Sequence, residues 1–375
     1  MDVEAEISNC PARPLYTRLV FKPKVLKAMG KVFLGKYLEA IKRQSLKGRC
    51  LHFDTGERCK EIISAHSIQR MGQLQHIAED GHVYRMNGDI STLRKTNGNP
   101  VPKRIGIGKA STFLGFCKAH DNALFEPIDN FRLRPTAEQA ALYAHRSLCR
   151  EFFVKENAMQ VMKEIIASSD LEESILQIMN AMLGGTSLGV KGLQYHKKCY
   201  DDALRKKSFD EFRFISFFSD SRCSLQLSGL LYPEFDFLGR ELNDLSDWSS
   251  APGLITAFTA PTDTGWSFTF AWHGSSDSIC VPFIQSLIEC VAQGDKLEDL
   301  LLRFSISTCE NHAIRISWWD GLPESGKQAV LGKFRLMLDP GEPVSVDYLR
   351  EGCEGLADWI FGPVVTNLEV GPNGG

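Results

Sequence analysis

The stretch that decides the fold of the N-terminal part runs from Cys50 to Asn122 and contains two pairs of ligand-type residues. Cys50 and Cys59 are separated by eight residues, and Cys117-Lys118-Ala119-His120 has a Cys-x-x-His spacing. Cysteine thiolates and histidine imidazoles in such pairs are the usual ligands of small tetrahedral zinc sites. Asp54-Thr55-Gly56-Glu57 is typical of a turn that returns Cys59 to Cys50. The pattern predicts a zinc site of three cysteines and one histidine; the alternative is free buried cysteines.

The composition is that of a globular protein with reduced thiols. The chain has 375 residues, of which 43% are apolar and 24% charged, so it is long enough for two or three domains. The N-terminus is acidic and lacks the apolar core of a secretory signal, and no apolar run is long enough to span a bilayer. Eleven cysteines without regular spacing argue against a disulfide framework. We therefore expect a cytoplasmic protein without a membrane partner.

Charge is distributed unevenly along the chain. Residues 1–110 contain 20 basic and 10 acidic residues, whereas the remainder contains 23 basic and 36 acidic residues. A basic part is attracted to polyanions such as nucleic acid, and an acidic part is not. The asymmetry predicts nucleic-acid binding by the N-terminal part, with a protein partner possible through the acidic C-terminal part. Docking of the basic part on the acidic part is the alternative.

Helical periodicity from Lys24 to Arg43 places several basic residues on one face. Such a face can simply be solvated, and contact with phosphates is the functional alternative. The sequence gives these candidates for contacts with a nucleic-acid backbone: Lys24, Lys27, Lys31, Arg43, Lys103 and Arg104. Lys103 to Ser111 lacks the spacing of a phosphate-binding P-loop.

Residues 60–69 are expected to form a short strand with His66 near its end, and residues 81–84 the next strand. Further on, the spacing predicts a long helix over 135–167 and a second over 171–183 that ends at Gly184-Gly185. We expect strands at 212–218, 223–231, 254–259, 266–272 and 314–319, with helices at 281–292 and over most of 344–361.

Together these elements predict an α+β protein: an N-terminal zinc module, a helical linker region and a C-terminal α+β domain with a largely antiparallel sheet. The predicted divisions are a basic helical region (1–49), the zinc module (50–130), a helical region (131–204), the α+β domain (205–365) and a tail (366–375).

Two phrases of the zinc module resemble a known family. Ser64-Ala65-His66-Ser67-Ile68-Gln69 and Gly115-Phe116-Cys117-Lys118-Ala119-His120-Asp121 are similar to segments of HNH nucleases and of bacterial proteins of unassigned function that share their arrangement. HNH nucleases are zinc-stapled members of the treble-clef, or ββα-metal, group. The resemblance covers about residues 48–130 and implies a treble-clef-like zinc module.

The resemblance also implies roles for individual residues. His66 would be the catalytic histidine of the first strand, Asn97 or Asn99 the loop asparagine, and Asp121 the ligand of a catalytic Mg²⁺ or Mn²⁺ ion. The chain departs from the family in the wide Cys-x8-Cys pair, in the long gap from His66 to Cys117, and in an Asp where the family keeps His or Asn.

Three functions are therefore open: a metal-dependent HNH-type nuclease, a non-catalytic module that binds nucleic acid or a partner, and an interaction or sensing factor with purely structural zinc. Catalysis requires His66 and Asp121 to converge on a second metal, whereas binding requires neither.

Overall fold

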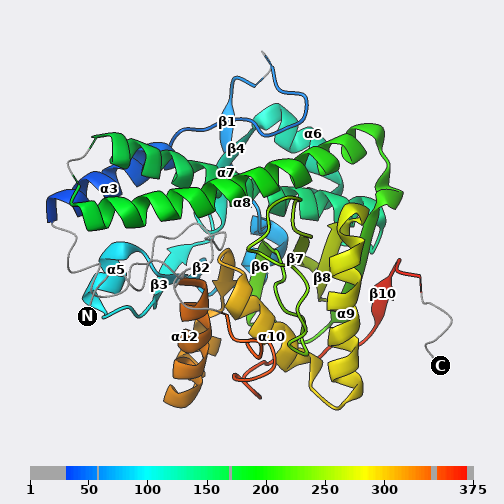
Figure 1. The fold of residues 1–375 in the computed structure, drawn as a ribbon. Coiled ribbons are helices and arrows are strands. Elements are labelled where there is room, and N and C mark those ends of the chain that lie inside the picture. Colours follow the sequence, from blue (N-terminus) through cyan, green and yellow to red (C-terminus); the bar gives the residue numbers. More distant parts are fainter. Residues whose placement is uncertain (1–30, 57–58, 169–170, 339–343, 370–375) are drawn as a thin grey trace.

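The computed structural model describes residues 31–56, 59–168, 171–338 and 344–369 (Figure 1). Within them the chain is a mixed α+β protein whose strands pair antiparallel throughout. The helices are α3 (Lys31–Ser45), α4 (Gln75–Ile77), α5 (Ile90–Lys95), α6 (Lys118–Asp129), α7 (Ala137–Ser168), α8 (Glu173–Lys206), α9 (Asp277–Ala292), α10 (Leu297–Thr308), α11 (Ile316–Gly321) and α12 (Glu324–Leu338). The strands are β1 (Ile62–His66), β2 (His82–Asn87), β3 (Val101–Gly106), β4 (Thr112–Cys117), β5 (Phe212–Ser219), β6 (Leu225–Leu231), β7 (Ile255–Pro261), β8 (Trp266–His273), β9 (His312–Ile314) and β10 (Val364–Thr366).

The large sheet has eight strands in the order β10-β5-β8-β7-β6-β9-β2-β3, and both faces of its strands β5–β8 are largely buried. Side chains alternate between two cores along each strand. On β8, for example, Phe268 and Phe270 pack with Phe283 of α9 and Phe304 of α10, whereas Ala271 packs with the core beneath α7. Helices α7 and α8 cover one face, and α9 and α10 cover the other (Figure 1).

Two strands from the N-terminal part belong to this large sheet. β2 pairs with β9 through Tyr84 and Ile314, and β3 extends the sheet beyond β2. The segment between β1 and β4 therefore forms β2, α5 and β3 at the edge of the large sheet. The chain then continues into β4, which pairs with β1. Such pairing joins residues far apart in sequence, so local patterns do not predict it.

A second, two-stranded sheet is formed by β1 and β4, and α6 follows β4 directly. It is fixed to the large sheet by buried polar contacts. Asn311 donates from Nδ2 to Ser67 Oγ (2.8 Å) and to the carbonyl of Ser228 (2.9 Å), while Ser67 Oγ lies 2.7 Å from Ser111 Oγ. Since unpaired buried polar groups are costly, this network specifies one docking geometry.

Several predicted elements are confirmed and three are wrong. The helices over 135–167 and 281–292 and the four strands between 212 and 272 are present as α7, α9 and β5–β8. The second helix does not end at Gly184-Gly185: α8 continues to Lys206, because packing along α7 outweighs the low helix propensity of two glycines. It ends instead at Lys207, in the left-handed conformation with φ 58°.

The other two errors lie near the C-terminus. The strand predicted at 314–319 is mostly helical. β9 ends at Ile314, and α11 begins at Ile316. The described part of 344–361 is irregular and not mainly helical. Positive φ angles at Gly352 (88°), Cys353 (65°) and Gly355 (69°) are incompatible with a helix there. Of the helix predicted over 24–43, residues 24–30 lie outside the described residues, and the rest is the beginning of α3.

Candidate metal centre

The two-stranded sheet and α6 place the second ligand pair. β1 and β4 pair in a register that sets Ile62 opposite Cys117 and His66 opposite Thr112. Cys117 is the last residue of β4 and the residue that precedes α6, and it is buried. His120 follows within the first turn of α6. A strand that ends directly in a helix therefore presents a thiol and an imidazole on one compact knuckle.

The first ligand pair lies on the segment before β1, which is held against β4 by backbone hydrogen bonds. Arg49 N donates to the Leu114 carbonyl (3.0 Å), and Leu51 N donates to the Gly115 carbonyl (2.8 Å). Cys50 lies between these two anchors and so faces Cys117. Cys59 N donates to the Gly56 carbonyl (3.0 Å).

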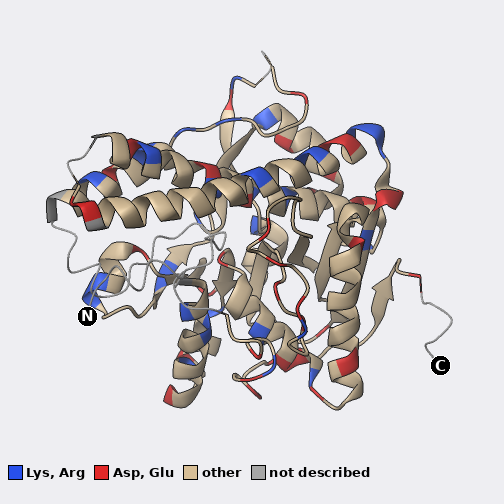
Figure 2. Ribbon diagram, viewed as in Figure 1, with Lys and Arg blue, Asp and Glu red and all other residues tan. Residues whose placement is uncertain are grey.

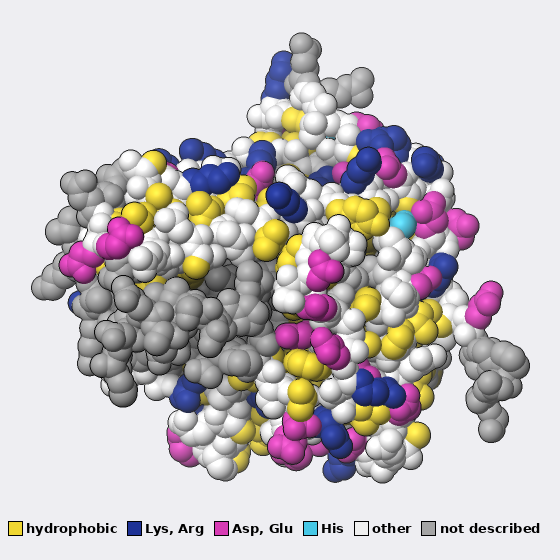
Figure 3. Space-filling model, viewed as in Figure 1, with side chains coloured by type: hydrophobic (Ala, Val, Ile, Leu, Met, Phe, Trp, Pro, Cys, Tyr) yellow, Lys and Arg dark blue, Asp and Glu magenta, His cyan; other side chains and the backbone are white. Residues whose placement is uncertain are grey.

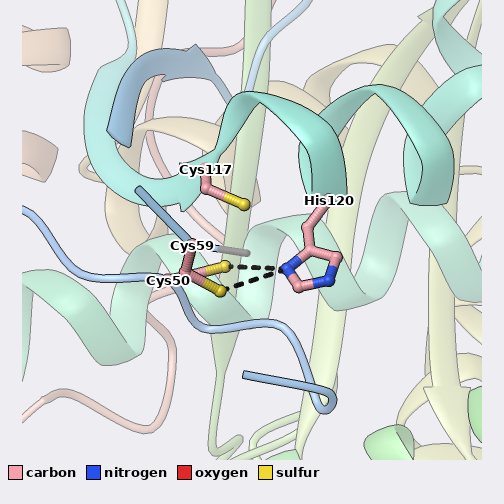
Figure 4. Close-up of side chains that lie close together, drawn as sticks. All are labelled: Cys50, Cys59, Cys117 and His120. Carbon is pink, nitrogen blue, oxygen red and sulfur yellow. Dashed lines mark hydrogen bonds between the residues drawn. The ribbon is translucent and has the colours of Figure 1, made fainter. Parts of the chain in front are cut away.

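The four predicted ligands converge (Figure 4). Their ligand atoms all lie within 4.8 Å of one another, and Nδ1 of His120 is 3.4 Å from Cys50 Sγ and 3.5 Å from Cys59 Sγ. Zinc bonds of about 2.3 Å to sulfur and about 2.0 Å to nitrogen at a tetrahedral angle give a sulfur–nitrogen separation of about 3.5 Å. The geometry matches a tetrahedral Cys3His site with Nδ1 as the imidazole ligand.

Neighbouring groups fix the orientation of these ligands. The ring of His52 stacks on that of His120, with centroids 4.0 Å apart and planes 8° apart, and His52 Nδ1 accepts a hydrogen bond from Asp54 N (3.0 Å). Burial lowers the pKa of His52 to about 4, so its ring stays neutral beside the centre. A neutral stacked ring orients His120 without adding positive charge beside a bound cation.

Two arginines attach the centre to the long helices. Arg49 lies over the ring of Phe153 on α7, with its guanidinium 4.3 Å from the ring centroid, and pairs with Glu156 at 2.5 Å. Arg205 of α8 contacts Asp54 (3.6 Å). The metal centre is therefore coupled to the α7–α8 pair on both sides of Cys50.

Chemically, this donor set is suited to a structural role. Four protein ligands fill the tetrahedral coordination of zinc, so the site has no open position for water or substrate. Burial raises the pKa of Cys50 to about 11, so a bound cation is needed to hold that sulfur as thiolate at neutral pH. The residues therefore fit zinc, and zinc would contribute to folding by cross-linking the segment before β1 to the beginning of α6.

Within the described residues, no hydrogen bond or ion pair joins the three predicted catalytic residues, His66, Asn97 and Asp121. His66 lies at the end of β1, away from the zinc ligands, and Nε2 is 3.1 Å from the carbonyl of Ile107. Asp121 is buried, and burial raises the pKa of its carboxyl group. Asn97 has φ 53° after α5, on the insertion at the edge of the large sheet, and neighbouring Asn99 is bonded to Arg335 of α12. The spacing of residues in the sequence does not predict that the loop with Asn97 and Asn99 lies at the edge of the large sheet.

One buried arginine, which the sequence pattern did not single out, lies close to Asp121. Arg146 of α7 is buried and forms two hydrogen bonds with Asp129, from Nη1 (2.7 Å) and Nη2 (2.6 Å). Burial has the largest effect on the pKa of Asp121 and on that of His66, and the positive charge of Arg146 lowers both. The signal was available in the helical pattern, since Arg146 follows His145 on an otherwise apolar stretch, but its partner Asp129 is a non-local contact.

The predicted nucleic-acid contacts occupy separate places. Lys24 and Lys27 lie outside the described residues, and Lys31 begins α3. Arg43, at the other end of α3, pairs with Glu164. Lys103 and Arg104 are exposed on edge strand β3. Figure 2 shows basic and acidic residues interspersed along the upper helices and in the lower part of the molecule, and Figure 3 shows side chains of both signs across this face.

His145 and Cys149, one turn apart on α7, are both buried in the core. His145 Nε2 lies 2.8 Å from Asp201 Oδ1 and 3.6 Å from Cys149 Sγ, and Lys197 Nζ lies 2.6 Å from Asp201 Oδ2. The cluster ties α7 to α8. Although burial lowers the pKa of His145, the contacts with Cys149 and Asp201 raise it to about 9 overall.

Within the described residues, no helix is both long and apolar enough to cross a membrane. No protein-family model, no curated protein and no solved structure matches the chain.

Proposed function

We propose that the chain is a zinc-stapled, treble-clef-like protein of the HNH type that binds nucleic acid through its N-terminal module, with the zinc in a structural role. One observation carries the proposal: β1, β4 and α6 form a strand–strand–helix unit with the Cys3His cluster at one end and His66 at the other. The closed donor set supports a structural zinc, and the excess of basic residues before residue 110 supports a polyanionic ligand.

Phosphodiester hydrolysis is the second candidate, and one observation favours it. If Nε2–H of His66 donates to the Ile107 carbonyl, Nδ1 keeps its lone pair and could accept a proton from water. Burial lowers the pKa of His66, so the ring would be neutral and able to act as a base at pH 7.

The surroundings of His66 do not fit the Mg²⁺ or Mn²⁺ ion that an HNH nuclease needs. Such an ion takes several oxygen ligands and keeps some of its water. Here Asp121 is buried, and both oxygens of Asp129 are engaged by the guanidinium of Arg146. A cation would have to displace that guanidinium. We therefore favour binding over cleavage and assign no catalytic step to a second metal.

The test uses zinc-loaded full-length protein and fluorescently labelled 20-nucleotide DNA and RNA, measured by anisotropy from about 50 to about 300 mM salt. We expect binding whose affinity falls steeply with salt, because phosphate contacts release counterions. No binding at low salt, or an affinity that does not change with salt, would contradict the proposal and favour a protein partner. A parallel plasmid-nicking assay with Mg²⁺ or Mn²⁺ compares wild type with His66→Ala; nicking that disappears in the variant would establish the nuclease instead.

A further inference from the structure

Beyond the metal centre, two segments far apart in sequence lie side by side at the His66 end of the strand–strand–helix unit. One is the π-helical turn Arg70–Leu74, and the other is 128–134, which begins at the end of α6. Gln69 Nε2 donates to the Ile128 carbonyl and lies 3.2 Å from Asp129 Oδ1. A Cβ placed on Gly72 would lie 3.5 Å from Nη1 of Arg132, so the Arg132 side chain lies beside the π-helical turn.

The surface of these segments is basic and aromatic. Arg70, Arg132 and Arg134 are all exposed, and so are two large apolar side chains, Met71 (71%) and Phe131 (62%). We call these five residues the arginine–phenylalanine face. Burial lowers the pKa of His66, and the charge of Arg70 lowers it further. Burial also lowers the pKa of His76, and the charge of Arg132 lowers it further. Both arginines therefore lie close to the end of β1 and the turn after it.

The carboxylate at the border of this face does not cancel its charge. Asp129 is already neutralised by the two hydrogen bonds from Arg146. Gln73 and Leu133 fix the two segments to β7, through hydrogen bonds with the Thr259 carbonyl and with the Pro261 carbonyl (2.8 Å). The exposed arginines and Phe131 therefore project from a backbone held by the large sheet, and less conformational entropy is lost when they bind a ligand.

We propose that the arginine–phenylalanine face binds single-stranded nucleic acid, with a base stacked on Phe131 and backbone phosphates paired with Arg70, Arg132 and Arg134. An exposed aromatic ring among arginines provides the two elements of single-strand binding: a stacking surface for any base and positive charge for the backbone. In a duplex the bases are stacked on one another and cannot reach Phe131. The inference rests on the proposed function and names its surface and its strand preference.

The test compares a 20-nucleotide single strand with the duplex of the same sequence, using zinc-loaded full-length protein. We expect tighter binding of the single strand. Phe131→Ala should weaken single-strand binding by about fivefold or more, as removal of one stacked base does, and should change duplex binding little. Arg70→Ala/Arg132→Ala should reduce the slope of log affinity against log salt by about 0.7 for each phosphate that the protein no longer neutralises.

Matched controls separate this inference from the proposed function. Ile360→Ala removes a similarly exposed apolar side chain (68%) elsewhere, and Lys206→Ala/Lys296→Ala removes two exposed charges; neither should change binding. If wild type binds nucleic acid but Phe131→Ala and Arg70→Ala/Arg132→Ala bind as tightly as wild type, or if the duplex is preferred, the face is not the site. If wild type binds no nucleic acid at all, the proposed function fails with it.

Discussion

At the scale of single residues, buried charge at the border between α6 and α7 is the most informative feature. Arg146 contacts both oxygens of Asp129, and its guanidinium lies 4.0 Å from the centroid of the Phe125 ring. This guanidinium therefore neutralises the carboxylate at the end of α6 and joins α6 to α7.

Arg146→Ala should destabilise the protein. It would leave the Asp129 carboxylate without its partner and Phe125 without its cation, and breaking a buried ion pair typically costs about 3–5 kcal/mol. Because the side chain of Asp129 is 37% exposed and water can partly replace the arginine, we expect a smaller effect, about 2–3 kcal/mol.

Urea denaturation measures this decrease in the free energy of unfolding, with Arg94→Ala as the control. Arg94 is exposed on α5, so its removal should change the free energy by no more than about 0.5 kcal/mol. Equal stability of Arg146→Ala and wild type would show that the pair is not formed in solution.

The zinc ligands were predictable at this scale, and the reason is chemical. Cysteine and histidine residues paired at short spacing are typical zinc ligands, and Cys117 and His120 need only one helical turn to come together. The catalytic role of Asp121 stays a prediction: its carboxyl group is buried and lies near Arg146, which is distant in sequence. Burial of that kind cannot be read from local spacing.

At the scale of elements, α7 and α8 connect the candidate metal centre to the large sheet, and the contact of His145 with Asp201 joins the two helices. His145 is fully buried, and burial lowers its pKa, but the contacts with Cys149 and Asp201 outweigh burial and raise the pKa to about 9. An unfolded histidine has a pKa of about 6.5. A pKa raised on folding stabilises the folded state below the unfolded value, and this stability is lost as the pH rises through the folded value.

We therefore expect the free energy of unfolding to fall as the pH rises from about 6.5 to about 9, and this part of the pH dependence to disappear in His145→Gln. The glutamine variant should also be less stable than wild type at about pH 6.5, because Asp201 would keep only the bond from Lys197. Urea denaturation across this range gives both quantities. The same decline with pH in the variant would assign it to another group.

Local sequence patterns predict some of the strands and helices but not others. The strands β5–β8 were predictable because aromatic and β-branched residues fill both faces of a buried sheet. The continuation of α8 through Gly184-Gly185 was not, since it depends on the packing of a second long helix. The irregular structure of the described residues between 344 and 361 depends on three residues with positive φ, of which only the glycines signal a break.

At the scale of the whole molecule, the N-terminal module is not an independent appendage. β2 and β3 extend the large sheet, while the segment before β1, the end of β4 and the first turn of α6 carry the candidate metal ligands, so residues 50–130 belong structurally to both parts. The buried contacts of Ser67 with Asn311 and of Gln73 with Thr259 reinforce this arrangement. Zinc binding should therefore stabilise the large sheet as well as the module, because chelation would release the segment from which both are built.

The central claim is that three cysteines and one histidine hold one structural zinc ion in this chain. X-ray absorption spectroscopy of full-length protein purified without chelator, combined with elemental analysis, tests it most directly. The account predicts one zinc per chain with three sulfur neighbours at about 2.3 Å and one nitrogen at about 2.0 Å, and a sulfur count that falls in Cys117→Ser. Protein without stoichiometric zinc, a shell dominated by oxygen or nitrogen, or a spectrum unchanged by Cys117→Ser would contradict it.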